Sequence, residues 1–154
     1  MSATNSQLQL ETYFLKELSY FLKDNLDTIP EPVAEISPVG LKIEDLTKLI
    51  DEQQRKWRCE LTIKSSDAAS GESFYKFKIV MVGFFTVNPA LSAEQAKILA
   101  ESNCPAVLYS TSREIIATVT RRSPYPAVLL PLVTFVKNIE EPKPKKRAVK
   151  KKSE

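Results

Sequence analysis

The stretch GFFTVNPALSAEQAKILAESNCPAVLYSTSREIIATVTRRSPYPAVLLPLVTF, residues 83–135, determines much of the expected fold. Its apolar residues form the end of a predicted strand, two helical faces and a final run at 127–136 that prolines interrupt. That run is too apolar for an ordinary loop and too rich in proline for a strand. Contiguous apolar surface on a soluble protein marks a binding site or a subunit interface. The stretch therefore predicts one of these two.

The composition is that of one ordinary globular domain. The 154 residues are 43% hydrophobic and 27% charged, which is typical of a soluble protein with a modest core. No apolar run is long enough to cross a membrane, and the first residues lack the basic and apolar regions of a secretory signal. Cys59 and Cys104 have no spacing typical of a disulfide framework or a metal site. We expect a cytoplasmic protein whose two thiols are reduced and buried.

The positive charge is concentrated at the C-terminus. Residues 137–154 hold eight Lys and Arg against three Glu, whereas residues 1–136 hold fourteen Lys and Arg against sixteen Asp and Glu. The sequence therefore predicts a near-neutral domain at 1–137 and a basic, disordered tail at 138–154. Such a tail is either a solvated extension or a segment that holds nucleic acid or an acidic partner by counterion release.

Alternation of apolar and polar residues predicts three strands. Residues 8–20 predict a long strand with both faces partly covered. Residues 57–64 alternate more regularly and, with a strand at about 73–87, predict an antiparallel hairpin. The segment VMVGFF, residues 80–85, is apolar on both faces, so a second layer must cover it. That layer is either another subunit or this chain's own helices and a loop.

The subunit alternative predicts an oligomer interface, whose residues would be Val80, Val82 and Phe85.

The long connection between the first two strands divides into two parts. Its first part holds three prolines and is expected to be extended. In the second part, residues 41–54, Ile43, Leu46, Leu49 and Ile50 recur at helical spacing. This pattern predicts an amphipathic helix, which would either pack in the core or lie as a lid over a groove.

Two further helices are expected after the strands. Ser92 and Gln95 have the spacing of a capping box and predict a short helix. Asn103 and Pro105 predict the start of a longer helix, which would end at the arginines 121–122. Strands first and helices last favour an α+β fold with helices packed on one face of a sheet.

The sequence offers little equipment for catalysis. It contains no histidine, which removes the commonest general base and metal ligand, and its three glycines are too far apart for a phosphate-binding loop. The polar cluster at 110–114 resembles the solvent face of a helix. We therefore predict no catalytic, cofactor-binding or metal-binding residues, and no cofactor.

Four motifs resemble the protein-export chaperone SecB family in order and spacing: GFFTV, NCPAVLY, SREIIATVTRRSPYP and LLPLVTF. In that family a glycine-aromatic strand end precedes a helix that begins at Cys-Pro and carries an Arg-Glu pair. An apolar segment then follows an aromatic-Pro step. The segment LKELSY is similar to the family's first strand. The resemblance covers about 90 of the 154 residues. The matching positions are Cys104, Pro105, Tyr109, Arg113 and Glu114 on the helix, Phe84 and Phe85 at the strand end, and Pro126, Leu130 and Phe135 in the closing segment.

The resemblance implies a four-stranded antiparallel sheet with a long helix packed on one face, a short C-terminal apolar segment and assembly as a dimer of dimers. The fourth strand would come from an early or middle segment, such as 29–40. The implied function is an ATP-independent holdase, which binds unfolded polypeptides in apolar grooves without a cofactor. The groove would draw on Phe84, Tyr109, Ile116, Leu129, Leu132 and Phe135, backed by Leu46, Leu49 and Trp57.

Two departures from the family concern the partner. In export SecB an acidic residue on the third strand helps to engage the SecA motor, but the matching residue here is Lys78. The basic C-terminal region is a second departure, and both count against SecA as a partner. Relatives outside export protect an antitoxin, which makes an antitoxin a second possible client. The alternative hypothesis is a non-enzymatic adaptor whose tail binds nucleic acid or an acidic partner.

Overall fold

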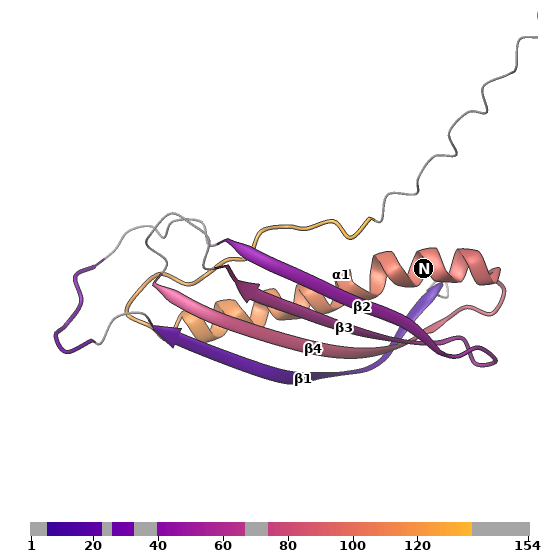
Figure 1. The fold of residues 1–154 in the computed structure, drawn as a ribbon, viewed down its shortest axis with the longest axis horizontal. Helices are drawn as coiled ribbons and strands as arrows, with labels where there is room; N and C mark the ends of the chain where they lie inside the picture. Colours follow the sequence, from indigo (N-terminus) through magenta and orange to yellow (C-terminus); the bar gives the residue numbers. More distant parts are fainter. Residues whose placement is uncertain (1–5, 23–25, 33–39, 67–73, 137–154) are drawn as a thin grey trace, which may run out of the picture.

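A four-stranded antiparallel sheet with one long helix packed on one face makes up the fold (Figure 1). The computed structural model describes residues 6–22, 26–32, 40–66 and 74–136. The predicted α+β class is confirmed. The elements are β1 (Leu8–Leu22), β2 (Leu41–Asp51), β3 (Lys56–Ser65), β4 (Tyr75–Val87) and α1 (Ala93–Thr120).

The strand order across the sheet is β1-β4-β3-β2. β2, β3 and β4 follow one another as antiparallel neighbours, which confirms the predicted hairpin. The chain must cross from β1 at one edge to β2 at the other, so the long connection between these two strands is a crossover. β1 and β2 are therefore the two edge strands.

The predicted helix at 41–54 is wrong, because β2 occupies this segment. Within β2 the half-buried residues alternate, and Leu41, Ile43, Asp45 and Thr47 turn toward the helix side. Asp45 and Thr47 occupy positions where the sequence pattern expects apolar residues, so the period of two is hidden. Pairing with β3 over the whole strand outweighs the helical spacing. The fourth strand is thus 41–51 and not 29–40, a range of which residues 33–39 lie outside the described residues.

One helix stands where two were expected. The capping box at its start is present, because the Ser92 hydroxyl accepts from the Gln95 N–H and the Gln95 side chain accepts from the Ser92 N–H, both at 3.2 Å. Pro105, expected at a helix start, lies inside α1. It is buried against the sheet beside Cys104 and Leu108, and this packing compensates for the missing backbone hydrogen bond.

The core lies between α1 and one face of the sheet. Alternate residues of β3 and β4 point to this face, and the buried members are Trp57, Cys59, Leu61, Ile63, Tyr75, Phe77, Ile79, Met81, Phe85 and Val87. Gly83 lies on this face of β4, between Met81 and Phe85. A Cβ there would lie 2.9 Å from Leu108 Cδ2 and 2.8 Å from Phe85 Cε2, so glycine allows the helix to approach the strand.

The opposite face of the sheet carries charged side chains next to two buried valines, Val80 and Val82. Lys16 of β1 and Glu60 of β3 form an ion pair at 3.3 Å across β4. In the register, Val82 of β4 pairs with Glu60 on one side and with Phe14 on the other. Val82 is therefore only 7% exposed. Hydrogen bonds from Arg58 and Lys16 lower the pKa of the Glu60 carboxyl, which favours the charged form in this network.

Two of the three predicted interface residues, Val80 and Val82, lie on this charged face, and both are buried. The third, Phe85, lies in the core under α1 instead. The interface predicted from the apolar run VMVGFF is thus divided between two faces of the sheet, because neighbouring strand residues alternate.

After α1 the chain turns and runs back along the helix as an extended segment, residues 121–136 (Figure 1). Hydrogen bonds fix it in place: Thr120 Oγ1 accepts from the Val128 N–H at 2.8 Å, and Arg113 Nε donates to the Leu130 carbonyl at 2.9 Å. The Tyr109 hydroxyl donates to the Pro131 carbonyl. Prolines prevent this segment from joining the sheet, so helix side chains supply its partners instead.

Replacing Gly83 by Ala should destabilise the protein by about 1–3 kcal/mol, because the new methyl group overpacks the contact between β4 and α1. Urea unfolding followed by circular dichroism measures this change. Gly→Ala in an unhindered strand stabilises the fold instead. An unchanged or raised midpoint would therefore show that α1 does not depend on this close approach.

Thr120→Val should cost about 1–3 kcal/mol, because the buried Val128 N–H loses its acceptor. Thr118→Val is the matched control, since Thr118 lies exposed on the same helix and should change stability by less than about 0.5 kcal/mol. Equal unfolding midpoints for the two variants would contradict the role of Thr120 in holding the segment.

Candidate functional site

The candidate functional site is a groove between the β2–β3 hairpin and the first turns of α1. Its volume is about 480 Å³, within the range of pockets that bind small molecules or a few side chains. The residues that line it are Thr47, Lys48, Leu49, Glu52, Arg55, Trp57, Ala93, Lys97 and Glu101.

The turn between β2 and β3 positions this groove. Arg55 adopts a left-handed backbone conformation, with φ of 53°, and its Nη2 donates to the Leu91 carbonyl at 3.1 Å. The Asp51 carboxylate accepts from the Gln54 N–H at 3.0 Å, which closes the turn. The hairpin end is thereby tied to the residues that precede α1, and the two walls of the groove are held together.

Trp57 and Leu49 give the groove its apolar character. They are register partners on β3 and β2 and point to the helix side of the sheet. Trp57 is 5% exposed, and its Nε1 has no hydrogen-bond partner among the described residues. Leu49 is 42% exposed. Leu49 therefore supplies exposed apolar surface to the groove, and the Trp57 ring packs beside it.

The backbone of β2 adds a second means of binding. β2 is the outermost strand of the sheet, so one side of its backbone pairs with no other described strand. An extended peptide can add to such an edge through main-chain hydrogen bonds, which do not depend on its sequence. The charged residues around the groove have both signs, with Lys97 and Arg55 opposed by Glu52 and Glu101. Neither acidic nor basic peptides are excluded.

The structure brings only two of the nine predicted groove residues together at this groove, Leu49 and Trp57. Tyr109 and Ile116 are buried in the core under the sheet. Phe84 and Leu46 lie on the charged face. There the Phe84 ring packs edge-on against the Phe14 ring, with 6.5 Å between the ring centroids.

The three remaining predicted residues lie on the C-terminal segment. Leu129 and Leu132 are 77% and 85% exposed, whereas the neighbouring residues Val128 and Leu130 are buried. The Phe135 ring packs edge-on against Tyr109 at 5.7 Å. The segment therefore presents a separate row of apolar side chains to solvent, next to the helix that holds it.

The sequence reasoning missed a third apolar surface, on β1. Irregularities between Leu10 and Thr12 and between Leu15 and Glu17 interrupt its pairing with β4. After the first, Tyr13 and Leu15 pair opposite Gly83 and Met81, and both are exposed beside the helix. A bulge moves the following residues to the other face, so Phe14 lies on the charged face although Leu10 and Leu18 lie on the helix side. The sequence did contain a signal for this surface, because apolar residues occur on both faces of the strand.

The two thiols are not exposed for chemistry. Burial raises the pKa of the Cys59 thiol to about 11 and also raises the pKa of Cys104. Both remain protonated and act as small apolar groups at neutral pH. Among the described residues, no three side chains of the types that bind metals gather at one point, and no helix has the length and hydropathy of a membrane span.

Comparison with known proteins agrees with this architecture. The family described as preprotein translocase subunit SecB matches residues 1–142. The protein-export protein SecB of Haemophilus ducreyi is 29% identical over 133 residues, which are 86% of this chain and 75% of that protein. The protein-export protein SecB of Nitrobacter hamburgensis is 23% identical over 150 residues, covering 97% of this chain and 92% of that protein.

A solved structure has the same fold. It is a SecB-like chaperone of Mycobacterium tuberculosis in complex with a ChAD peptide from the HigA1 antitoxin, with a TM-score of 0.62 and 14% identity. The similarity covers 82% of this chain and 91% of that one. The family match extends over nearly all of the chain and includes every described strand and α1. The chain belongs to the SecB family.

Proposed function

We propose that this protein is a holdase chaperone that binds unfolded polypeptide segments without ATP or another cofactor. Membership of the SecB family supports a chaperone role in protein export. The proposal adds the site: an extended client segment lies in the groove between β2 and α1, with an apolar side chain against Leu49 and Trp57. The observation that carries it is an apolar pocket next to the outer edge of β2, which pairs with no other described strand.

The groove suits clients of varied sequence. Main-chain hydrogen bonds to β2 recognise any extended segment, and burial of one apolar client side chain contributes about 1.5–3 kcal/mol. Leu129 and Leu132 offer further apolar contact on the C-terminal segment. Several weak contacts of this kind give broad binding without strong selection among clients. A single exact fit is not required.

Two kinds of client have the chemistry that this site accepts. Export precursors are unfolded polypeptides, and the Mycobacterium tuberculosis relative was solved with a peptide from an antitoxin. Both present apolar side chains on an extended backbone, and the groove does not distinguish them. The adaptor hypothesis depends on the basic tail at 138–154, which lies outside the described residues.

We further propose that the protein assembles with copies of itself through β1. This edge strand is 15 residues long, and its exposed large apolar side chains lie on both faces of the strand: Tyr13, Phe14, Leu15, Leu18 and Phe21. An exposed apolar edge invites pairing with another strand, and a second β1 buries both sets at once. This surface replaces Val80, Val82 and Phe85, which the protein's own side chains cover.

Leu49→Asp should weaken client binding about tenfold, because a charge in the groove opposes burial of an apolar client side chain. Trp57 is the only tryptophan of the chain, so its fluorescence reports occupancy of the groove. The measurement is titration with a tryptophan-free unfolded client, together with suppression of that client's aggregation in light scattering.

Leu46→Asp is the matched control for the groove, because Leu46 lies on the same strand but on the opposite face and is 58% exposed. It should leave both the fluorescence titration and the holdase activity unchanged. If Leu46→Asp and Leu49→Asp weaken the holdase equally, or neither does, the groove is not the client site.

Leu15→Glu should convert the assembly into smaller species, because it places a charge in the apolar edge of β1. Light scattering coupled to size-exclusion chromatography measures the mass, and circular dichroism verifies the fold. Leu46→Glu, on the other edge strand, should retain the wild-type mass. An unchanged mass for the Leu15 variant would rule out assembly through this strand.

A further inference from the structure

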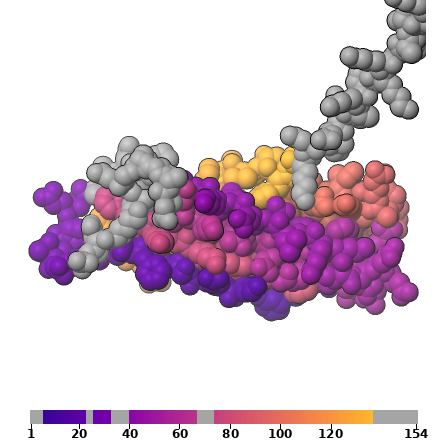
Figure 2. Space-filling view, viewed as in Figure 1, coloured from indigo at the N-terminus to yellow at the C-terminus, as the bar shows by residue number. Residues whose placement is uncertain are grey.

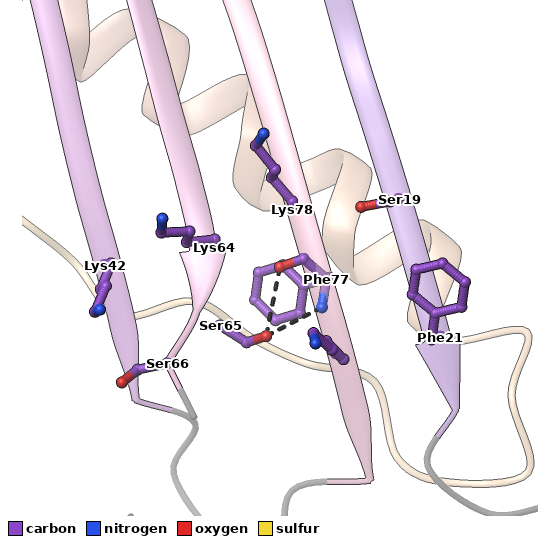
Figure 3. A pocket seen from close by; sticks show the side chains of 9 residues that line it. Ser19, Phe21, Lys42, Lys64, Ser65, Ser66, Phe77 and Lys78 are labelled. Atoms are coloured by element: carbon purple, nitrogen blue, oxygen red, sulfur yellow. Dashed lines mark hydrogen bonds between the residues drawn. The ribbon is translucent and has the colours of Figure 1, made fainter. Parts of the chain in front are cut away.

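A second pocket lies on the charged face of the sheet, away from α1 and from the client groove (Figure 3). Its volume is about 330 Å³. Four of its nine lining residues are lysines, one or more from each of three strands. The lining residues are Ser19, Phe21, Lys42, Lys64, Ser65, Ser66, Lys76, Phe77 and Lys78.

The strand register places three of these lysines side by side. Lys42 pairs with Lys64, and Lys64 pairs with Lys78, so one row across β2, β3 and β4 consists of lysine alone. Like charges directly opposite on neighbouring strands destabilise a sheet. Figure 3 shows the labelled members of this row on the same side of the strands. The fold therefore keeps an unfavourable cluster of positive charge at one end of the sheet.

Only one of the four lysines has an acidic partner among the described residues. Lys78 Nζ lies 3.2 Å from a carboxylate oxygen of Glu17. Lys42, Lys64 and Lys76 make no ion pair with any described carboxylate. Elsewhere on the same face Arg58 and Lys16 are both paired with Glu60. The pocket differs from its surroundings in carrying positive charge that the described residues do not neutralise.

The floor of the pocket is ordered by the backbone. Pairing of β3 with β4 ends at Lys64 and Lys78, and beyond it the Ser65 hydroxyl accepts from the Phe77 N–H at 3.1 Å (Figure 3). Phe21 of β1 borders the pocket and is 61% exposed. The site thus combines ammonium groups with one exposed aromatic ring on a rigid sheet.

We propose that this lysine pocket binds an acidic peptide segment of a partner protein, in which carboxylates alternate with apolar side chains. Carboxylates would accept charge-assisted hydrogen bonds from Lys42, Lys64 and Lys76, and an apolar side chain would cover the Phe21 ring. Toward the middle of the sheet the same face carries Glu17 and Glu60. These carboxylates repel a long uniform polyanion, which favours a short acidic segment over nucleic acid.

The test is a titration of the full chain at low salt with a short fluorescein-labelled peptide of alternating glutamate and leucine, followed by anisotropy. Lys64→Gln should weaken binding about tenfold, the effect of losing one charge-assisted contact, and Lys64→Arg should retain it. Arg122→Gln is the matched control, because Arg122 lies exposed after the end of α1 and lines neither this pocket nor the client groove. The basic tail is common to all variants, so its contribution cancels.

Three outcomes would overturn the proposal. Equal weakening by Arg122→Gln and Lys64→Gln would show general charge attraction. Tighter binding of a single-stranded oligonucleotide of the same charge, with the same sensitivity to Lys64→Gln, would identify a nucleic-acid site. Absence of binding by the wild type at low salt would exclude an acidic ligand. Lys64→Gln should weaken binding by the same factor in a Leu49→Asp background, in which the client groove is impaired, so failure of the client groove does not affect the result.

Discussion

The packing of α1 against one face of the sheet is the contact on which the other features depend. Gly83 lets the helix approach β4, and Leu108 fills the space that a side chain would have taken. Because the helix lies there, its first turns form a wall of the groove beside β2, and its later turns supply Tyr109, Arg113 and Thr120 to hold the C-terminal segment. A shift of α1 would alter both apolar surfaces together.

The two faces of the sheet illustrate two ways of covering apolar side chains. On the helix side, burial follows from packing of large residues against α1. On the other side, ion pairs between β1, β3 and β4 cover Val82 in a single layer. Figure 2 shows the strands at the front of the molecule, with α1 visible at one end. A face covered by its own charged side chains remains available to solvent and to charged partners, whereas the helix side presents its apolar surface only at the margins.

Sequence reasoning recovered the strands whose alternation is regular. The hairpin of β3 and β4 was predicted because alternate residues there are consistently apolar, as in Cys59 and Leu61. It failed for β2, where Asp45 and Thr47 occupy half-buried positions and Leu46 points to solvent. An edge strand needs few apolar residues on its inner side, so its hydrophobic pattern carries little information.

The site was predicted only in part for a related reason. Residue type indicated which side chains are apolar, but not whether they face the core, the charged face or solvent. Leu49 and Trp57, predicted to back the groove, line the pocket beside α1, whereas Tyr109 and Ile116 are buried in the core. The lysine row could not be foreseen, because Lys42, Lys64 and Lys78 are far apart in the chain and only the strand register places them together.

The strand order also has a consequence for biosynthesis. β1 leaves the ribosome first, yet its neighbour in the sheet is β4, and Leu8 pairs with Val87. The hairpins of β2, β3 and β4 join residues close in the chain and can form early, whereas β1 must wait for them. Until then its apolar residues have no partner in the sheet. During its own synthesis, this protein passes through a state with the same exposed apolar segments that we propose it binds in others.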